Sequence, residues 1–216
     1  MNIIQNIKVM IITLINKIKS FIMALRRKLQ EKQYMTIAKK ADIVVTQLGY
    51  DDTVIYIPIP TMTNRLDRAL HKNDSFDCGL MISNIINRMS NIISFNIDER
   101  NLGSGLNMMN QISYDVESTL QDTSSHTREL SLLQYKPTRF IQTIMETQSL
   151  ISEALDNWKN KFLRVAPLYE NNDNFKFSLL SRVNTAILRA GNNILSLNNL
   201  QLRSYMEGLK NVIKYH

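Results

Sequence analysis

The chain has 216 residues, enough for one substantial hydrophobic core or for one core with an extended arm. Glycine and proline are scarce, with six and four residues, which argues against sandwiches and barrels with many tight turns. The single cysteine, Cys78, excludes an internal disulfide. We therefore expect an all-α protein of a reducing compartment, either cytoplasmic or, if the gene is viral, in a virion.

The formal net charge of +7 is concentrated near the N-terminus. The first 40 residues hold nine lysines and arginines but only one acid, Glu31, so the rest of the chain is close to neutral. Any acidic surface that the protein meets is expected to contact this segment. The cations that we assign to a basic patch are Lys17, Lys19, Arg26, Arg27, Lys28 and Lys32.

Residues 2–28, NIIQNIKVMIITLINKIKSFIMALRRK, combine cations with a heptad pattern. With Ile4 at position a, apolar residues fill every a and d position for more than three heptads, and further apolar residues widen this seam. Such a helix needs cover on more than one side. Internal lysines argue against a simple membrane span. The predicted interface residues of this seam are Ile4, Ile7, Ile11, Leu14, Ile18, Phe21 and Leu25.

The helical pattern continues to about residue 48, and Gly49 is a natural C-terminal stop. An extended stretch is predicted from Thr53 to Ile59, in which Pro58 restricts the chain to the edge of a sheet. We accordingly divide the chain into a basic amphipathic helical arm, residues 1–48, and a helical bundle body, residues 49–216.

Helical periodicity returns after residue 61, with Thr63 as a possible N-cap and a strong apolar repeat over residues 75–95. Residues 97–105, IDERNLGSG, are predicted to form a loop. Gly103, Ser104 and Gly105 make its end the most flexible point of the chain, and residues 101–105 are a candidate hinge.

Two heptad runs follow. The first spans residues 109–133 and is predicted to end at Pro137; the second spans 141–165 and is predicted to end at Pro167. We expect the two helices to form an antiparallel hairpin about 40 Å long. The polar centre of the first seam, Thr119, Thr123 and His126, is expected to face Gln148 or water, or to set the register of the seam against alternatives.

Trp158 lies on the seam of the second run and is predicted to be a core residue or an interface anchor. After a polar loop at residues 167–174, two further helices are predicted to meet near Gly191. The expected architecture is an elongated bundle of long heptad-patterned helices with a short extended insert near residues 53–59.

The chain lacks the motifs that carry chemistry. Its three histidines and one cysteine include no pair at the i, i+3 or i+4 spacing of helical metal ligands. Nor does it contain a nucleophile elbow, a phosphate-binding loop or a dinucleotide-binding pattern. We expect no enzymatic activity, no metal or other cofactor and no small-molecule substrate.

Three functions agree with these features. The first is a structural or assembly protein that binds copies of itself or partner proteins through amphipathic helices, such as a connector, neck or inner-shell component of a phage or virus. The second is a peripheral scaffold whose basic N-terminal helix binds a membrane surface. The third is nucleic-acid binding by the basic arm, which lacks interleaved aromatic residues.

Overall fold

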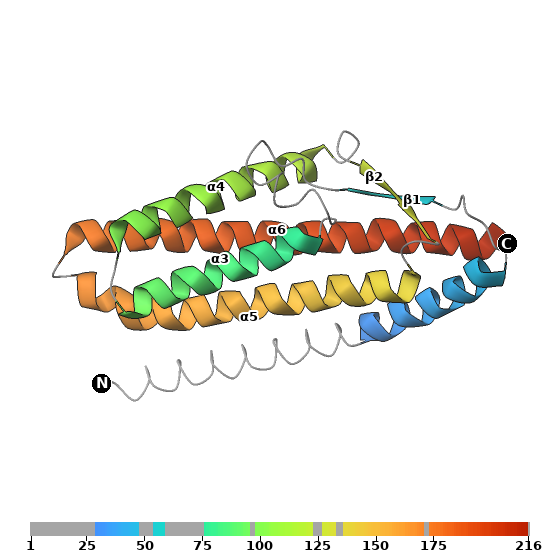
Figure 1. Ribbon diagram of the computed structural model, residues 1–216, viewed down its shortest axis with the longest axis horizontal. Coiled ribbons are helices and arrows are strands. Elements are labelled where there is room, and N and C mark those ends of the chain that lie inside the picture. Colours follow the sequence, from blue (N-terminus) through green and yellow to red (C-terminus); the bar gives the residue numbers. More distant parts are fainter. Residues whose placement is uncertain are drawn as a thin grey trace, which may run out of the picture.

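The computed structural model describes residues 29–47, 54–58, 76–95, 98–122, 127–132, 136–170 and 173–215. Most of these residues are helical, and they form an elongated bundle with a two-stranded sheet (Figure 1). This arrangement confirms the predicted fold class. The elements in chain order are helix 29–47, β1 (Val54–Pro58), α3 (Phe76–Phe95), α4 (Glu99–Gln121), β2 (Thr127–Ser131), α5 (Pro137–Glu170) and α6 (Asn174–Tyr215).

Helices α5 and α6 lie antiparallel along the length of the bundle (Figure 1). Helix α6 has 42 residues, and a rise of about 1.5 Å per residue makes it about 63 Å long. The other elements pack on this pair, so the pair joins two hydrophobic cores. The first core lies near the α5–α6 connection, and the second lies toward the C-terminus.

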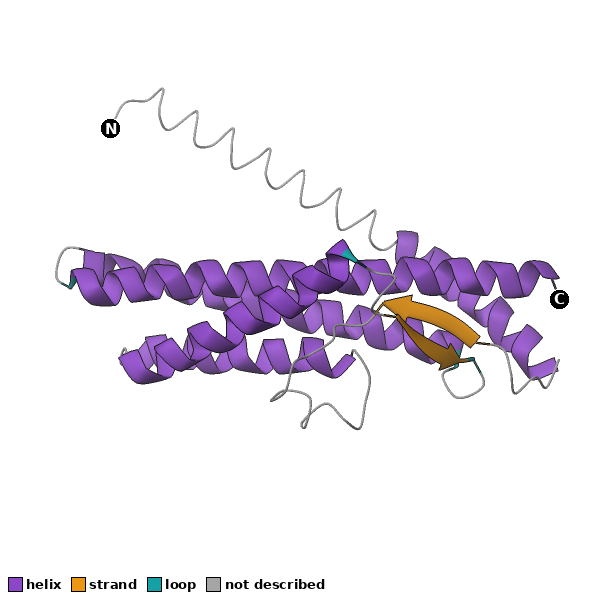
Figure 2. Cartoon of the chain, turned by 90° about the horizontal axis from the view of Figure 1, so that it is seen from above, coloured by secondary structure: helices purple, strands orange, loops and turns teal. Residues whose placement is uncertain are grey.

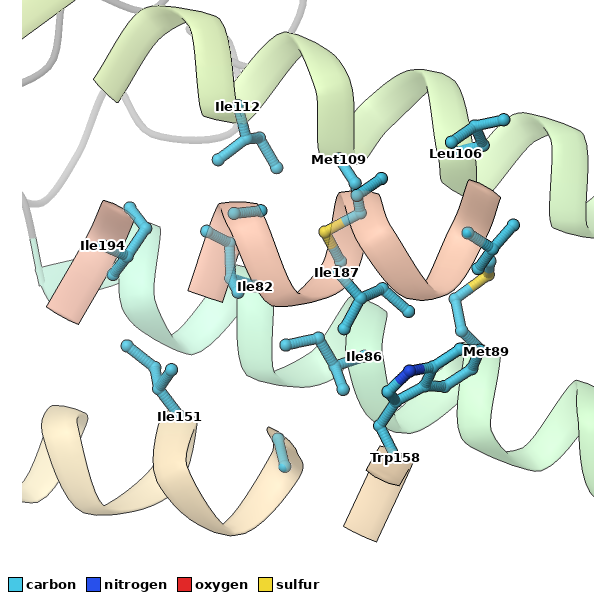
Figure 3. Packing of buried hydrophobic residues seen from close by; sticks show 14 of the residues in the cluster. Ile82, Ile86, Met89, Leu106, Met109, Ile112, Ile151, Trp158, Ile187 and Ile194 are labelled. Carbon is cyan, nitrogen blue, oxygen red and sulfur yellow. The ribbon is translucent and has the colours of Figure 1, made fainter. Parts of the chain in front are cut away.

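The first core is enclosed by four helices, because α3 packs on α5 and α4 packs on α6. Each of these helices places apolar residues at helical spacing on the side that faces the others. Figure 3 shows the side chains pointing toward one another, among them Ile86 of α3, Met109 of α4, Trp158 of α5 and Ile187 of α6. All four side chains are fully buried.

The second core lies among helix 29–47, the two strands and the other ends of α5 and α6. It contains Ala38 and Ala41 of the first helix, Ile57 of β1 and Tyr205 of α6. The ring of Tyr205 packs against that of Phe140, with 4.0 Å between the centroids. Figure 2 shows the strands and helix 29–47 at this end of the bundle.

Strand β1 confirms the extended stretch that the sequence predicts at this position. Its side chains alternate, with Ile55 and Ile57 buried and Tyr56 exposed, as expected for a strand that covers a core with one face. The strand pairs antiparallel with β2, and Ile55 stands opposite Leu130. At its end, Gln201 of α6 donates a hydrogen bond of 2.8 Å from Nε2 to the carbonyl oxygen of Pro58.

The predicted loop at residues 97–105 is wrong from Glu99 onward, because residues 99–105, which include the candidate hinge at 101–105, lie within α4; residue 97 lies outside the described residues. Asp98 caps the helix, and its Oδ1 accepts hydrogen bonds from the backbone N–H groups of Arg100 and Asn101. Gly105 serves a close helix contact rather than flexibility. A Cβ at this position would come within 2.2 Å of the sulfur of Met89 on α3.

The predicted boundaries of the two heptad runs are also wrong. Helix α4 ends at Gln121, and the residues assigned to its last turns include β2, in which Leu130 is buried. One buried leucine fits either the helical or the strand period, so the pattern could not separate them. Pro137 begins α5, where proline needs no hydrogen-bond partner for its nitrogen, and Pro167 lies inside α5, which continues to Glu170.

The predicted hairpin of these runs is replaced by a different pairing. Helix α4 packs mainly on α6, and α5 packs on α3 and α6. Thr119 is buried and donates from Oγ1 to the carbonyl oxygen of Asp115, while Gln148 donates from Nε2 to Oδ1 of Asn199. In place of the expected contact, Thr119 and Gln148 each form a hydrogen bond with a different residue. Thr123 and His126 lie outside the described residues.

The two predicted C-terminal helices are one helix, α6, and the break at Gly191 is wrong. The glycine packs against Leu155 of α5, whose methyl carbon would lie 2.7 Å from an added Cβ and would have to shift. The α5–α6 pair thus approaches closely at this residue. The division of the chain into an arm and a body stays a prediction, as does the N-cap at Thr63, because these features fall partly or wholly outside the described residues.

Candidate interaction surfaces

Most of the predicted interface and basic patch lies outside the described residues. This applies to the whole seam from Ile4 to Leu25 and to the five cations before residue 29. Their roles stay predictions. Lys32 is described, and it lies exposed on helix 29–47.

Helix 29–47 has two distinct faces. We call inner face the side that contacts the bundle; it consists of Tyr34, Ala38, Ala41 and Val45, and the last three are buried. We call outer face the exposed opposite side, which consists of Leu29, Lys32, Thr36, Lys39, Lys40 and Ile43. Exposed lysines beside exposed leucine and isoleucine make the outer face amphipathic in its own right.

Trp158, which the sequence placed in the core or at an interface, lies in the core. Its indole N–H donates a hydrogen bond of 2.9 Å to Oδ1 of Asn184 on α6. The ring stacks on Phe162, with 6.2 Å between the centroids. A buried tryptophan needs such a polar partner, so the residue anchors α5 to α6 inside the chain itself.

A polar cluster joins α4 to α6. Arg189 binds Glu117 with two hydrogen bonds, of 2.7 Å from Nε and 2.5 Å from Nη2, and Asn193 donates to the same carboxylate. The hydrogen bonds from Arg189 are the main cause that lowers the pKa of Glu117 below its ordinary value. All three groups are satisfied by one another, which suits a structural contact between helices rather than a reacting site.

Two surface grooves accompany the helices. One, of about 430 Å³, lies among helix 29–47, α5 and α6, and the amide pair of Gln148 and Asn199 lines it. The other, of about 580 Å³, lies between α4 and α6 and is lined by Phe177, Arg182 and Arg189 among others. Ser152 also lines the first groove, and its hydroxyl donates a hydrogen bond of 2.8 Å to the carbonyl oxygen of Gln148.

Large apolar side chains are exposed where α5 ends and α6 begins. The exposed fractions are 60% for Leu163, 62% for Leu168 and 66% for Phe175. We call these three residues the apolar end. The heptad pattern does not include them, because they lie outside the a and d positions of the run. In the sequence, the signal for these residues is that they are large and apolar although they lie off the heptad positions. One of them, Leu168, directly follows Pro167.

Within the described residues, no group of three or more His, Cys, Asp or Glu side chains is arranged to hold a metal ion. Burial raises the pKa of Tyr205, and the charge of Asp42 raises it further, so the hydroxyl keeps its proton. The described helices include none with the length and apolar character of a membrane span.

Comparison with known proteins finds no matching family model, no matching curated protein and no matching solved structure.

Proposed function

We propose that this chain is a non-enzymatic structural or assembly protein, which joins copies of itself or partner proteins through amphipathic helices. The observation that carries this proposal is the apolar end. Leu163, Leu168 and Phe175 are each more than half exposed at one end of an elongated bundle. Exposed apolar side chains at one end of a bundle offer surface that a partner protein could cover.

The rest of the fold supports a rigid component. The α5–α6 pair runs through both cores, and internal contacts such as that of Trp158 with Asn184 fix the helices to one another. A long rigid bundle would hold the apolar end at a fixed distance from any other surface through which the protein binds partners. A component of a viral or phage particle, of the connector, neck or inner-shell type, is the more specific form of this proposal.

The test measures the mass of the full chain in solution by light scattering, across a range of concentrations. We expect an oligomer whose mass falls in the variant Leu163→Gln, Leu168→Gln, Phe175→Gln. Glutamine keeps the size and helix preference of these positions while removing the apolar surface.

A matched control keeps the test specific. Leu150→Gln with Leu188→Gln changes two exposed leucines elsewhere on α5 and α6, and it should leave the mass unchanged. A full chain that stays monomeric at every concentration, or a control variant that dissociates as far as the variant of the apolar end, would contradict self-assembly through these residues.

A further inference from the structure

The groove between α4 and α6 contains hydrogen-bond donors that the described chain does not use. Arg182 lines this groove and lies exposed on α6. Among the described residues it forms no ion pair and no hydrogen bond. Ser178 and Ser181 also line the groove, and no described residue accepts a hydrogen bond from their hydroxyl groups. An occupant of the groove can therefore bind these donors without breaking a contact of the fold.

The charge of the groove is positive. Arg182 and Arg189 both line it, and no Asp or Glu is among the described residues that do so. The charge of Arg189 is compensated by Glu117, which it binds from beside the groove. Arg182 is left as a cation that no described acid compensates, so the groove suits an occupant with negative charge.

The groove continues along α6 to the apolar end. Seven residues make nearly two turns of an α-helix, or about 10 Å, so residues seven apart share one side. Phe175, Arg182 and Arg189 follow one another at this spacing, and the ring of Phe175 is 66% exposed. Helix α4 lies beside this part of α6 (Figure 1), and its Leu106 adds apolar surface to the groove.

This pattern favours a protein segment over other anionic occupants. A small molecule in a binding pocket is usually enclosed over most of its surface, whereas this groove is open along the helices. Nucleic acid has a negative charge at every phosphate and is bound by clusters of cations, but here one arginine is uncompensated. A peptide can place a carboxylate on Arg182 and an apolar side chain on Phe175, because its side chains can match the distance of about 10 Å between these positions.

We propose that the α4–α6 groove binds an acidic amphipathic segment of a partner protein. A carboxylate of the segment pairs with Arg182 and accepts hydrogen bonds from Ser178 and Ser181, while an apolar side chain of the segment covers Phe175. This inference rests on the proposed function, because it treats Phe175 as part of an interaction site. It adds the chemistry of the partner and the residues that recognise its charge.

The test is a titration of the isotopically labelled full chain with a synthetic helical peptide, followed by the amide chemical shifts. The peptide carries leucine on one side and glutamate beside it. We expect saturable shift changes in residues 106–110 and 175–189, and weaker binding as salt is added. The same peptide with glutamine in place of glutamate should bind about tenfold more weakly, since it lacks the charge.

Variants of the chain separate the charged contact from the apolar one. Arg182→Gln should weaken peptide binding about tenfold, and Arg182→Lys should weaken it less, because lysine keeps the charge but not the fork of donors. Phe175→Gln should also lose on the order of tenfold. The control Arg203→Gln removes an exposed arginine of α6 outside this groove and should bind as the parent does. Circular dichroism of every variant checks that the helices are retained.

Four results would overturn the proposal. They are the lack of saturable shifts in the groove at millimolar peptide, equal binding of the glutamine peptide, equal loss of binding in Arg203→Gln, and binding of duplex DNA in place of the peptide. The mass of the full chain is measured separately. A chain that is monomeric but binds the peptide in the groove rejects self-assembly and keeps this proposal, whereas an oligomer that does not bind the peptide rejects this proposal alone.

Discussion

The two cores of this protein are built in different ways on the same pair of helices. The first is covered by α3 and α4, which follow each other in the chain and repeat apolar residues at helical spacing. The second is covered by helix 29–47, β1 and β2, which come from three separate stretches. Periodicity within one segment is enough to indicate the first core, whereas the second depends on contacts between distant segments.

The largest expected effect tests whether the first core dominates stability. Trp158→Ala removes a fully buried ring and leaves Asn184 without its indole partner. We expect the free energy of unfolding in denaturant to fall by about 3–5 kcal/mol. Trp158→Phe keeps an aromatic ring and should lose less. A loss below about 1 kcal/mol for the alanine variant would mean that the core closes over the space.

The next effect contrasts a glycine at the second core, Gly208, with a glycine on helix α4 of the first core, Gly103. Gly208 of α6 lies under β1, where a Cβ would be 2.7 Å from Ile55, and branched isoleucine has few rotamers with which to yield. We expect Gly208→Ala to lower the unfolding free energy by about 1 kcal/mol, since overpacking outweighs the gain in helix propensity.

Gly103 of α4 is the matched case, because nothing lies within 4 Å of its added Cβ. Gly103→Ala should raise the unfolding free energy by up to about 1 kcal/mol, through helix propensity alone. Thermal and denaturant unfolding measure both variants. If Gly208→Ala and Gly103→Ala changed the unfolding free energy equally and in the same direction, crowding around the added Cβ would not explain the outcome.

A third effect concerns how the second core holds its strand. Gln201→Leu removes the hydrogen bond to the carbonyl oxygen of Pro58, which we expect to cost about 1 kcal/mol. Hydrogen exchange should show faster exchange in β1 while α3 keeps its protection. Faster exchange in both elements by the same factor would show that the two cores open together.

The smallest effect belongs to the exposed contact of Glu117 with Arg189 on the first core. Because the folded pKa of Glu117 is lowered, the contact stabilises above the carboxyl's ordinary pKa and is lost as the pH falls through the lowered value. Glu117→Gln should lower Tm by about 1–2 °C at neutral pH, since Arg189 is largely exposed. A difference in Tm that persists in acid, where the carboxyl is protonated, would contradict this account.

The sequence indicated which residues form part of the candidate surfaces, but not which way these surfaces face relative to the bundle. The heptad seam and the cations, including Lys32, follow from local spacing and composition. The burial of Ala38, Ala41 and Val45 fixes the phase of helix 29–47 against the bundle, whereas the seam before residue 29 lies outside the described residues. Tyr34, Ala41 and Val45 recur at helical spacing in the sequence, but that spacing does not say which elements this side of the helix contacts.

What the sequence by itself determined is the helical class, the existence of most helices and an extended stretch, predicted at residues 53–59 and observed at 54–58, because these depend on periodicity within one segment. The tertiary structure decided which helices pair, that Leu130 belongs to a strand, and that Gly105 and Gly191 lie inside helices. Those outcomes depend on neighbours distant in the chain. A glycine placed where two helices touch looks in sequence like a break, and only the second helix shows which side chain packs in the place of its missing Cβ.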